Sequence, residues 1–218
     1  MGARKIDILL ITIFLILPFL YNCGRISSRH EGRDLKRDTL VDQQVLLENS
    51  IYEPEFMING IALFNQVSLR QKLYKPVFIE SDKDEFPKMI LWNKSNQKLT
   101  LLSYPGDAKD RVSYFILEHY SDVVDFDKPN VFYVNDSLFI TNYGLTLDIS
   151  GDLVREKYAS YNIILVEQNT DSTTVLSYLE NDYQRNDWLK KYNMPVYIVR
   201  YCLVNNIVKK LEFGFQYP

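Results

Sequence analysis

Apolar residues are spaced unevenly along this chain, and their spacing divides it into three parts. Residues 8–21 form an uncharged, mainly apolar run, residues 24–42 are mainly polar, and from Ile51 onward Tyr, Phe, Val, Ile and Leu recur densely. Within this last part most apolar stretches are short and are bounded by turn-forming residues, as is typical of strands. The pattern predicts an α+β body that follows an apolar leader and a polar spacer.

The predicted strands are separated by residues that favour turns. Residues 93–96 and 105–107 separate the first three, and Asn205-Asn206 supplies two residues that tolerate positive φ between the last two. In the last strand, alternation predicts that Ile207, Leu211, Phe213 and Phe215 line one face. The predicted strands are 86–93, 98–104, 112–120, 163–168, 173–179, 195–204 and 207–217, and a further hairpin joins 131–134 to 137–141.

Two short amphipathic helices are predicted between these strands. The first contains Leu69 and ends near Tyr74. The second is better marked, because Ser150 is a suitable N-cap and Asp152 lies in the first turn. Its apolar face is predicted to contain Leu153, Val154 and Tyr158.

A weak internal repeat organises the body. The residue types of Gly60, Leu63, Leu69 and Tyr74 recur 84 residues later along the chain. We therefore expect two tandem α+β repeats, at 51–125 and 130–218, whose short helices pack against one face of an antiparallel sheet. The later positions are Gly144, Leu147, Leu153 and Tyr158.

The start of the chain has the features of an export signal. Arg4 and Lys5 precede the apolar run at 8–21, whose fourteen residues fall short of the roughly 20 that span a bilayer core. Pro18 would also interrupt a helix in that run. Residues 1–22 are therefore predicted to be a signal peptide.

The segment Leu20-Tyr21-Asn22-Cys23 resembles a lipobox, the motif that lipoprotein signal peptidase recognises. Tyr21 and Asn22 replace the usual small residues, as in the looser lipoboxes of some Gram-negative lineages. The resemblance implies that Cys23 is lipidated and becomes the mature N-terminus, with a diacylglycerol thioether and an N-acyl chain such as palmitate. These chains would bury methylenes at about 0.8 kcal/mol each, which is enough for a stable membrane anchor. The alternatives are an uncleaved N-terminal anchor and ordinary secretion.

Residues 23–45 are predicted to be the lipidated cysteine and a flexible polar tether. Cleavage after residue 22 would change the formal net charge from −3 to −4, and a mildly acidic body gives no footprint for nucleic acid. No acidic run follows Cys23, so we expect a lipid-anchored envelope protein on the outer membrane facing the periplasm. Exposure on the cell surface is the alternative.

Only one other cysteine remains in the mature chain. Because Cys23 is expected to be acylated, Cys202 has no intrachain partner, and no disulfide framework is predicted. Cys202 lies within an apolar strand pattern and is interpreted as a small core residue.

The second half resembles a β-lactamase-inhibitory-protein-like repeat, a fold also found in the small lipoprotein of the outer-membrane assembly machinery. The resemblance rests on Gly-Leu-Thr-Leu at 144–147, a helix ending near Tyr158, and a closing strand Val-Lys-Lys-Leu-Glu-Phe-Gly-Phe at 208–215. It covers about 140–217, extends more loosely over 58–120, and is interrupted by extra residues between 170 and 193. It implies a non-enzymatic protein that binds an envelope partner or supports envelope assembly.

The sequence contains few residues in arrangements typical of catalytic sites. The chain has two histidines, His30 and His119, and neither is accompanied by a Gly-x-Ser-x-Gly elbow. The acidic clusters at 82–85 and 122–127 are interpreted as solvated turns, because the second lacks the Gly and terminal Glu of a calcium loop. No catalytic residue, metal site or cofactor is predicted. A carboxylate pair formed only in space stays open.

Four aromatic residues fall in the least patterned part of the second half. They either anchor a loop on the core or form a contact surface, since Tyr and Trp are favoured at protein and glycan interfaces. The leading functional hypothesis is a membrane-anchored scaffold or protein-binding lipoprotein with no identified small-molecule ligand. Its rivals are a glycan-binding lipoprotein of a surface uptake system and an envelope hydrolase of unfamiliar type. The four residues are Tyr178, Tyr183, Trp188 and Tyr192.

Overall fold

The computed structural model describes most of the body of the chain. The described residues are 54–73, 75–79, 86–103, 111–120, 128–170 and 172–216, all within one compact unit at 51–218. Within these ranges no helix has the length and apolar character needed to cross a bilayer. The predicted signal peptide, Cys23, the tether, His30, Tyr74 and both acidic clusters lie outside the described residues.

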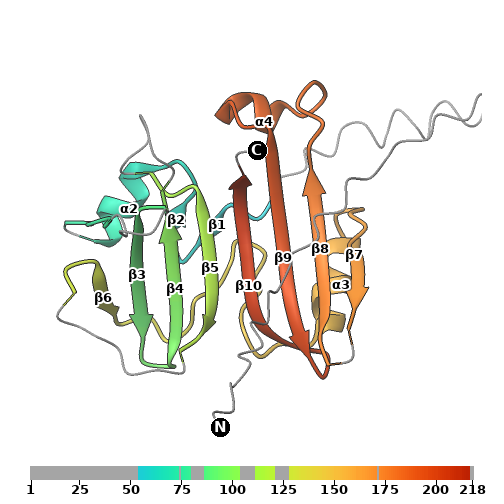
Figure 1. Ribbon diagram of the computed structural model, residues 1–218, viewed down its shortest axis with the longest axis horizontal. Coiled ribbons are helices and arrows are strands. Elements are labelled where there is room, and N and C mark those ends of the chain that lie inside the picture. The colour runs from blue at the N-terminus through green and yellow to red at the C-terminus, as the bar shows by residue number, and fades with distance from the viewer. Residues whose placement is uncertain are drawn as a thin grey trace, which may run out of the picture. The chain divides into compact units, whose positions relative to one another are not determined.

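An eight-stranded sheet dominates the body (Figure 1), in the order β6-β3-β4-β5-β10-β9-β8-β7. Neighbouring strands are antiparallel, except that β3 and β6 are parallel. The predicted α+β class with a largely antiparallel sheet is confirmed. The strands are β3 Lys88–Asn93, β4 Gln97–Leu102, β5 Tyr114–His119, β6 Val131–Val134, β7 Val166–Asn169, β8 Thr174–Glu180, β9 Val196–Val204 and β10 Ile207–Gln216, and a separate pair is β1 Met57–Ile58 and β2 Ile61–Ala62. The helices are α2 Gln66–Lys72, α3 Gly151–Ala159 and α4 Asp187–Tyr192.

The sheet is two antiparallel meanders joined at their last strands. Strands β3 to β5 form one, β7 to β10 form the other, and β5 pairs with β10. At this junction Phe213 pairs with Phe115, and their rings lie 5.0 Å apart inside the core. Buried residues of both meanders therefore form one continuous hydrophobic core.

Side chains on one face of the sheet contact the helices. Tyr158 of α3 packs against Tyr201 of β9 with ring centroids 6.0 Å apart. Trp188 of α4 stacks on Phe215 of β10 at 4.6 Å, and Phe215 also contacts Phe64, just before α2. Helices α3 and α4 thus pack on the face where alternation along the strands gathers apolar side chains.

The opposite face carries charged residues in cross-strand pairs. Lys98 of β4 pairs with Glu118 of β5 at 2.6 Å, and Glu212 of β10 pairs with Arg200 of β9 at 3.1 Å. Cys202 lies on this face opposite Lys210 and is only half-buried, so its assignment to the core was wrong. Burial raises the pKa of its thiol, and the nearby Glu212 carboxylate adds to the increase.

The Asn205-Asn206 hairpin turn is confirmed, with φ of 51° and 60° at its two residues. The predicted inward face of the next strand needs one correction. A register shift between Val208 and Lys210 places Val208 in the core, fully buried, and leaves Ile207 partly exposed. The bulge inserts an extra residue, so alternation counted back from Phe215 fails beyond it.

The predicted hairpin of 131–134 with 137–141 was also wrong. Strand β6 pairs in parallel with β3 instead, and Thr141 makes only an isolated bridge with Ile58. The amide side chain of Gln97 accepts from the Phe139 N–H at 2.8 Å, and that of Asn59 accepts from the Ile140 N–H at 2.6 Å. Side-chain amides therefore replace part of the strand ladder that the sequence pattern predicted.

The two glycines of the predicted repeat, and the residue four positions after each, have positive φ angles. Gly60 and Gly144 have φ of +84° and +80°, and four residues after each, Phe64 and Asp148 have φ of 55° and 61°. Each of these later residues donates its N–H to a carbonyl at or just before the last strand of its meander. The acceptors are Val112 at 2.8 Å for Phe64 and Val208 at 2.9 Å for Asp148.

Helices α2 and α3 follow these residues, but α3 begins one residue later than the repeat offset of 84 residues would place it. Ser150 caps α3 through the Asp152 N–H, as predicted. Leu69 of α2 is fully buried and Val154 fills the corresponding role in α3, whereas Leu153 is 46% exposed. The prediction of Leu153 on the apolar face was therefore wrong.

A buried carboxyl joins four segments of the body. Glu55 is fully buried; its Oε1 accepts from the Thr141 hydroxyl at 2.7 Å, and its Oε2 accepts from Tyr158 at 2.7 Å and Tyr201 at 2.5 Å. The Tyr197 hydroxyl donates to the Glu55 backbone carbonyl. Burial raises the pKa of this carboxyl, and the three side-chain hydrogen bonds offset only part of the increase.

We predict that Glu55→Gln changes how stability depends on pH. Above the ordinary pKa of 4.5 the unfolded chain loses this proton while the folded chain retains it, up to its raised value. The wild-type free energy of unfolding therefore falls through this window relative to E55Q, by at most about 1.4 kcal/mol per pH unit. Urea titrations of both proteins between about pH 4 and 8 would measure it, and parallel stability curves would contradict it.

We also predict that Gly214→Ala weakens the junction between the meanders. Gly214 has φ of +149°, and a Cβ there would lie 2.4 Å from the Ser113 carbonyl oxygen and 2.6 Å from the Tyr114 Cα. The combined strain and overlap should cost about 2 kcal/mol or more. Gly60→Ala is the control, since its Cβ would meet nothing within 4 Å and only the positive φ, at about 1 kcal/mol, would count. Equal losses in urea unfolding would refute the steric explanation.

Candidate functional site

A small pocket opens between α3 and the β7 end of the sheet. Its volume is about 270 Å³, and Leu176 of β8 contributes to it from the sheet. Residues of α3, of the chain leading into β7, and of β7 itself supply the rest. The apolar lining is Ala159, Ile163, Ile164, Leu165 and Leu176, and Arg155 and Glu167 supply the polar part.

Apolar side chains around this pocket are unusually exposed. Ile164 is 87% exposed and Val166 is 57% exposed, and all four residues of β7 are exposed to solvent. Single exposed apolar residues are common, but a group of them beside a pocket is typical of a contact site.

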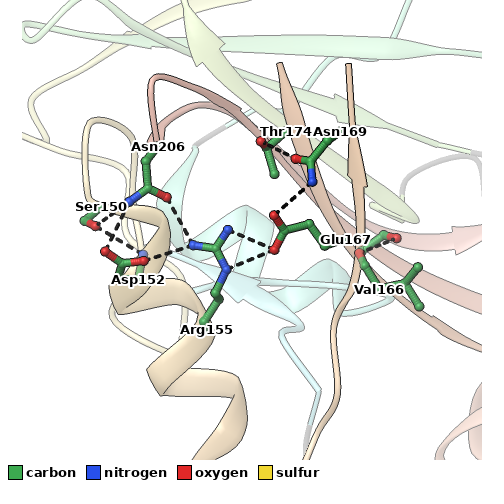
Figure 2. A network of polar contacts seen from close by, with 9 residues as sticks. Ser150, Asp152, Arg155, Val166, Glu167, Asn169, Thr174 and Asn206 are labelled. Atoms are coloured by element: carbon green, nitrogen blue, oxygen red, sulfur yellow. Dashed lines mark hydrogen bonds and ion pairs between the residues drawn. The ribbon is translucent and has the colours of Figure 1, made fainter. Parts of the chain in front are cut away.

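A polar network fixes the charged part of the pocket (Figure 2). The Arg155 guanidinium donates from Nε and Nη2 to Oε2 of Glu167, at 3.2 and 3.0 Å. Its Nη1 donates to Asp152 and to the side-chain oxygen of Asn206, both at 3.1 Å. Arg155 therefore links α3, the β9–β10 turn and the edge strand.

The chain approaches itself closely at the start of α3. Gly151 donates its N–H to the Asn206 carbonyl at 2.8 Å. A Cβ at Gly151 would lie 2.1 Å from a Leu203 methyl and 2.4 Å from the Asn206 side-chain oxygen. Glycine is therefore required for α3 to begin against the hairpin turn, which is what brings Arg155 to Asn206.

The network leaves the site with an excess of negative charge. Arg155 faces two carboxylates, Asp152 and Glu167. The hydrogen bond from Arg155 holds the pKa of the Glu167 carboxyl below its ordinary value, assisted by one from Asn169 at 3.3 Å. The Glu167 carboxylate is therefore charged at neutral pH, and Arg155 is shared between it and Asp152.

Strand β7 ends the sheet with one side of its backbone open. The Thr170 N–H donates to the Thr173 carbonyl at 2.8 Å and closes the turn to β8. Thr170 and Thr173 therefore form a hydrogen-bonded pair. Because such pairs alternate along an antiparallel ladder, Gln168 and Val166 also form hydrogen bonds to β8. The backbone groups of Glu167 and Asn169 point away from the sheet, and no described strand lies beyond them.

The four aromatic residues proposed as a contact surface all pack, half-buried, against the core. Trp188 contacts Tyr192 at 5.2 Å in addition to Phe215, and it belongs to α4, a helix that the sequence pattern does not predict. Tyr183 donates to Asn193 at 3.1 Å, and Tyr178 donates to Glu180 at 2.9 Å. The loop-anchoring interpretation describes these contacts, while a role in binding stays a prediction.

His119 takes part in a cluster of polar contacts at the surface. Its Nε2 lies 2.7 Å from Asp148, whose other oxygen accepts from Lys209 at 2.8 Å. The hydrogen bond from Lys209 is the main cause of the lowered pKa of Asp148. The ring is 37% exposed, and within the described ranges no group of His, Cys, Asp and Glu is arranged to hold a metal ion.

The sequence pattern does not predict the pocket. Residues 163–168 were predicted to form one strand, whereas β7 begins only at Val166. One signal was present: Ile163, Ile164, Leu165 and Val166 are consecutive apolar residues, which a half-buried edge strand does not need. Nothing in the sequence indicates that Arg155 reaches both Asn206 and Glu167.

Comparison with protein-family models, with curated proteins and with solved structures found no match for this chain.

We predict that Arg155→Ala loosens β7 without unfolding the body. The Val166 and Gln168 amides should exchange hydrogen several-fold faster, because the ion pair between Arg155 and Glu167 holds the edge strand to α3. Lys190→Ala is the matched control, since it removes a surface ion pair to Asp187 in α4. Hydrogen–deuterium exchange would measure both variants, and unchanged β7 exchange in R155A would show that the pair is dispensable.

Proposed function

We propose that this protein is a lipid-anchored, non-enzymatic lipoprotein of the cell envelope that binds a partner protein or acts as a scaffold. Cys23 would carry the lipid, residues 24–45 would be the tether, and the sheet-rich body would hold the partner site. An outer-membrane position facing the periplasm agrees with the absence of an acidic run after Cys23.

The observation that carries the protein-binding part is the apolar edge of the sheet. Ile164 and Val166 are largely exposed beside a preformed pocket, on a segment that Arg155 ties to the body. Covering these side chains would stabilise a complex through the hydrophobic effect, with little cost for ordering the site. The packing of the four aromatic residues leaves this edge as the better supported contact region.

A tandem duplication accounts for the shared features of the two halves. The matched glycines and left-handed residues, each followed by a helix, and the pairing of β5 with β10 are the features two copies of one unit would have. On this proposal the extra strand β7 belongs to the second copy alone and supplies its binding edge.

The test places a photo-crosslinking amino acid at Ile164 in the full-length protein, expressed in its native host. Illumination should give an adduct with another protein in the membrane fraction, because Ile164 would lie in the interface. The same amino acid at Lys94, an exposed residue of the β3–β4 turn, is the control and should give none.

Combining the crosslinker with Cys23→Ala tests the anchor in the same experiment. The altered protein should leave the membrane fraction and lose the adduct. Retention in that fraction would favour an uncleaved N-terminal anchor. Absence of an adduct at position 164 in the otherwise unaltered protein would refute the binding role of this edge.

A further inference from the structure

We propose that β7 binds an extended segment of a partner protein as a ninth strand of the sheet, with an apolar side chain in the α3–β7 pocket and a Lys or Arg beside Glu167. This inference rests on the proposed protein-binding function and adds the shape and charge of the bound segment.

The backbone of β7 is suited to receive another strand. Glu167 and Asn169 direct their N–H and carbonyl groups away from β8, and both residues are exposed. An added strand would satisfy these groups with main-chain hydrogen bonds, the basis of binding by strand addition.

The pocket lies on the α3 face of the sheet, and alternate side chains of an added strand would point to this face. Glu167 pairs with Leu176, whose side chain is in the core, so Glu167 and Leu165 point to the α3 side of the sheet. Alternate side chains of an added strand would point the same way, toward the apolar lining formed by Ala159 and Ile163. The intervening side chains would cover Val166 on the other face.

Charge complementarity favours a basic segment. Glu167 is the only charged residue of β7, and Arg155 is shared between Glu167 and Asp152, which leaves one carboxylate charge unbalanced. A Lys or Arg on the added strand would balance this charge, while an acidic residue there would be repelled. A second copy of β7 would bring another Glu167 and no cation, so a different protein is the better fit.

The test selects peptides from a phage-displayed library of random ten-residue sequences, using the detergent-solubilised full-length protein. Enriched peptides should alternate apolar and polar residues and carry Lys or Arg. Fluorescence anisotropy then compares Asn169→Pro with Asn169→Ala. Both variants lose the side chain, but only the proline loses the outward N–H. The peptides should bind N169P about tenfold more weakly than N169A.

A second measurement on the unaltered protein does not depend on the proline variant folding. Bound peptide should protect the Glu167 and Asn169 amides from hydrogen exchange, while Val166 and Gln168, which already bond to β8, should change little. Equal affinity for N169P and N169A, protection of neither outward amide, or failure to enrich any peptide would overturn strand addition. Adducts at Ile164 in the earlier experiment would still support protein binding through another geometry.

Discussion

The buried carboxyl of Glu55 is the interaction on which the rest of the body depends. It accepts hydrogen bonds from the hydroxyl groups of Thr141 in the connecting segment, Tyr158 in α3 and Tyr201 in β9. A carboxyl removed from water is costly unless its hydrogen bonds are met, so these three donors must be in place together. One residue thus fixes the first described segment, a helix and the sheet in a single arrangement.

With α3 fixed in this way, the position of the proposed binding edge follows. Tyr158 holds one side of the helix on the core, and Arg155 and Ala159, which lie beside it on the same helix, line the pocket. Arg155 then reaches the β9–β10 turn and β7. The edge is therefore preorganised by the core, although its own side chains are largely exposed, and this makes it suited to binding without a large ordering cost.

Local signals in the sequence predicted much of the fold. The Asn205-Asn206 turn and the Ser150 cap were found because each acts on backbone groups only a few residues away. Helix α4 was missed although its caps, Asn186 and Asn193, carry signals of the same kind. The contact site was predicted less completely. The aromatic residues proposed as a contact surface pack against the core, and the pocket residues were not predicted.

By itself the sequence determined the alternation of strands, most turns and the α+β class, since these depend on neighbours along the chain. Only the tertiary structure decided which strands pair, where the bulge moves Ile207 out of line, and that Glu55 meets Tyr201, 146 residues away. Arg155 likewise gains its role from Asn206, 51 residues away. Such contacts form because packing brings distant side chains together, and the spacing of residues in one segment carries no record of that packing.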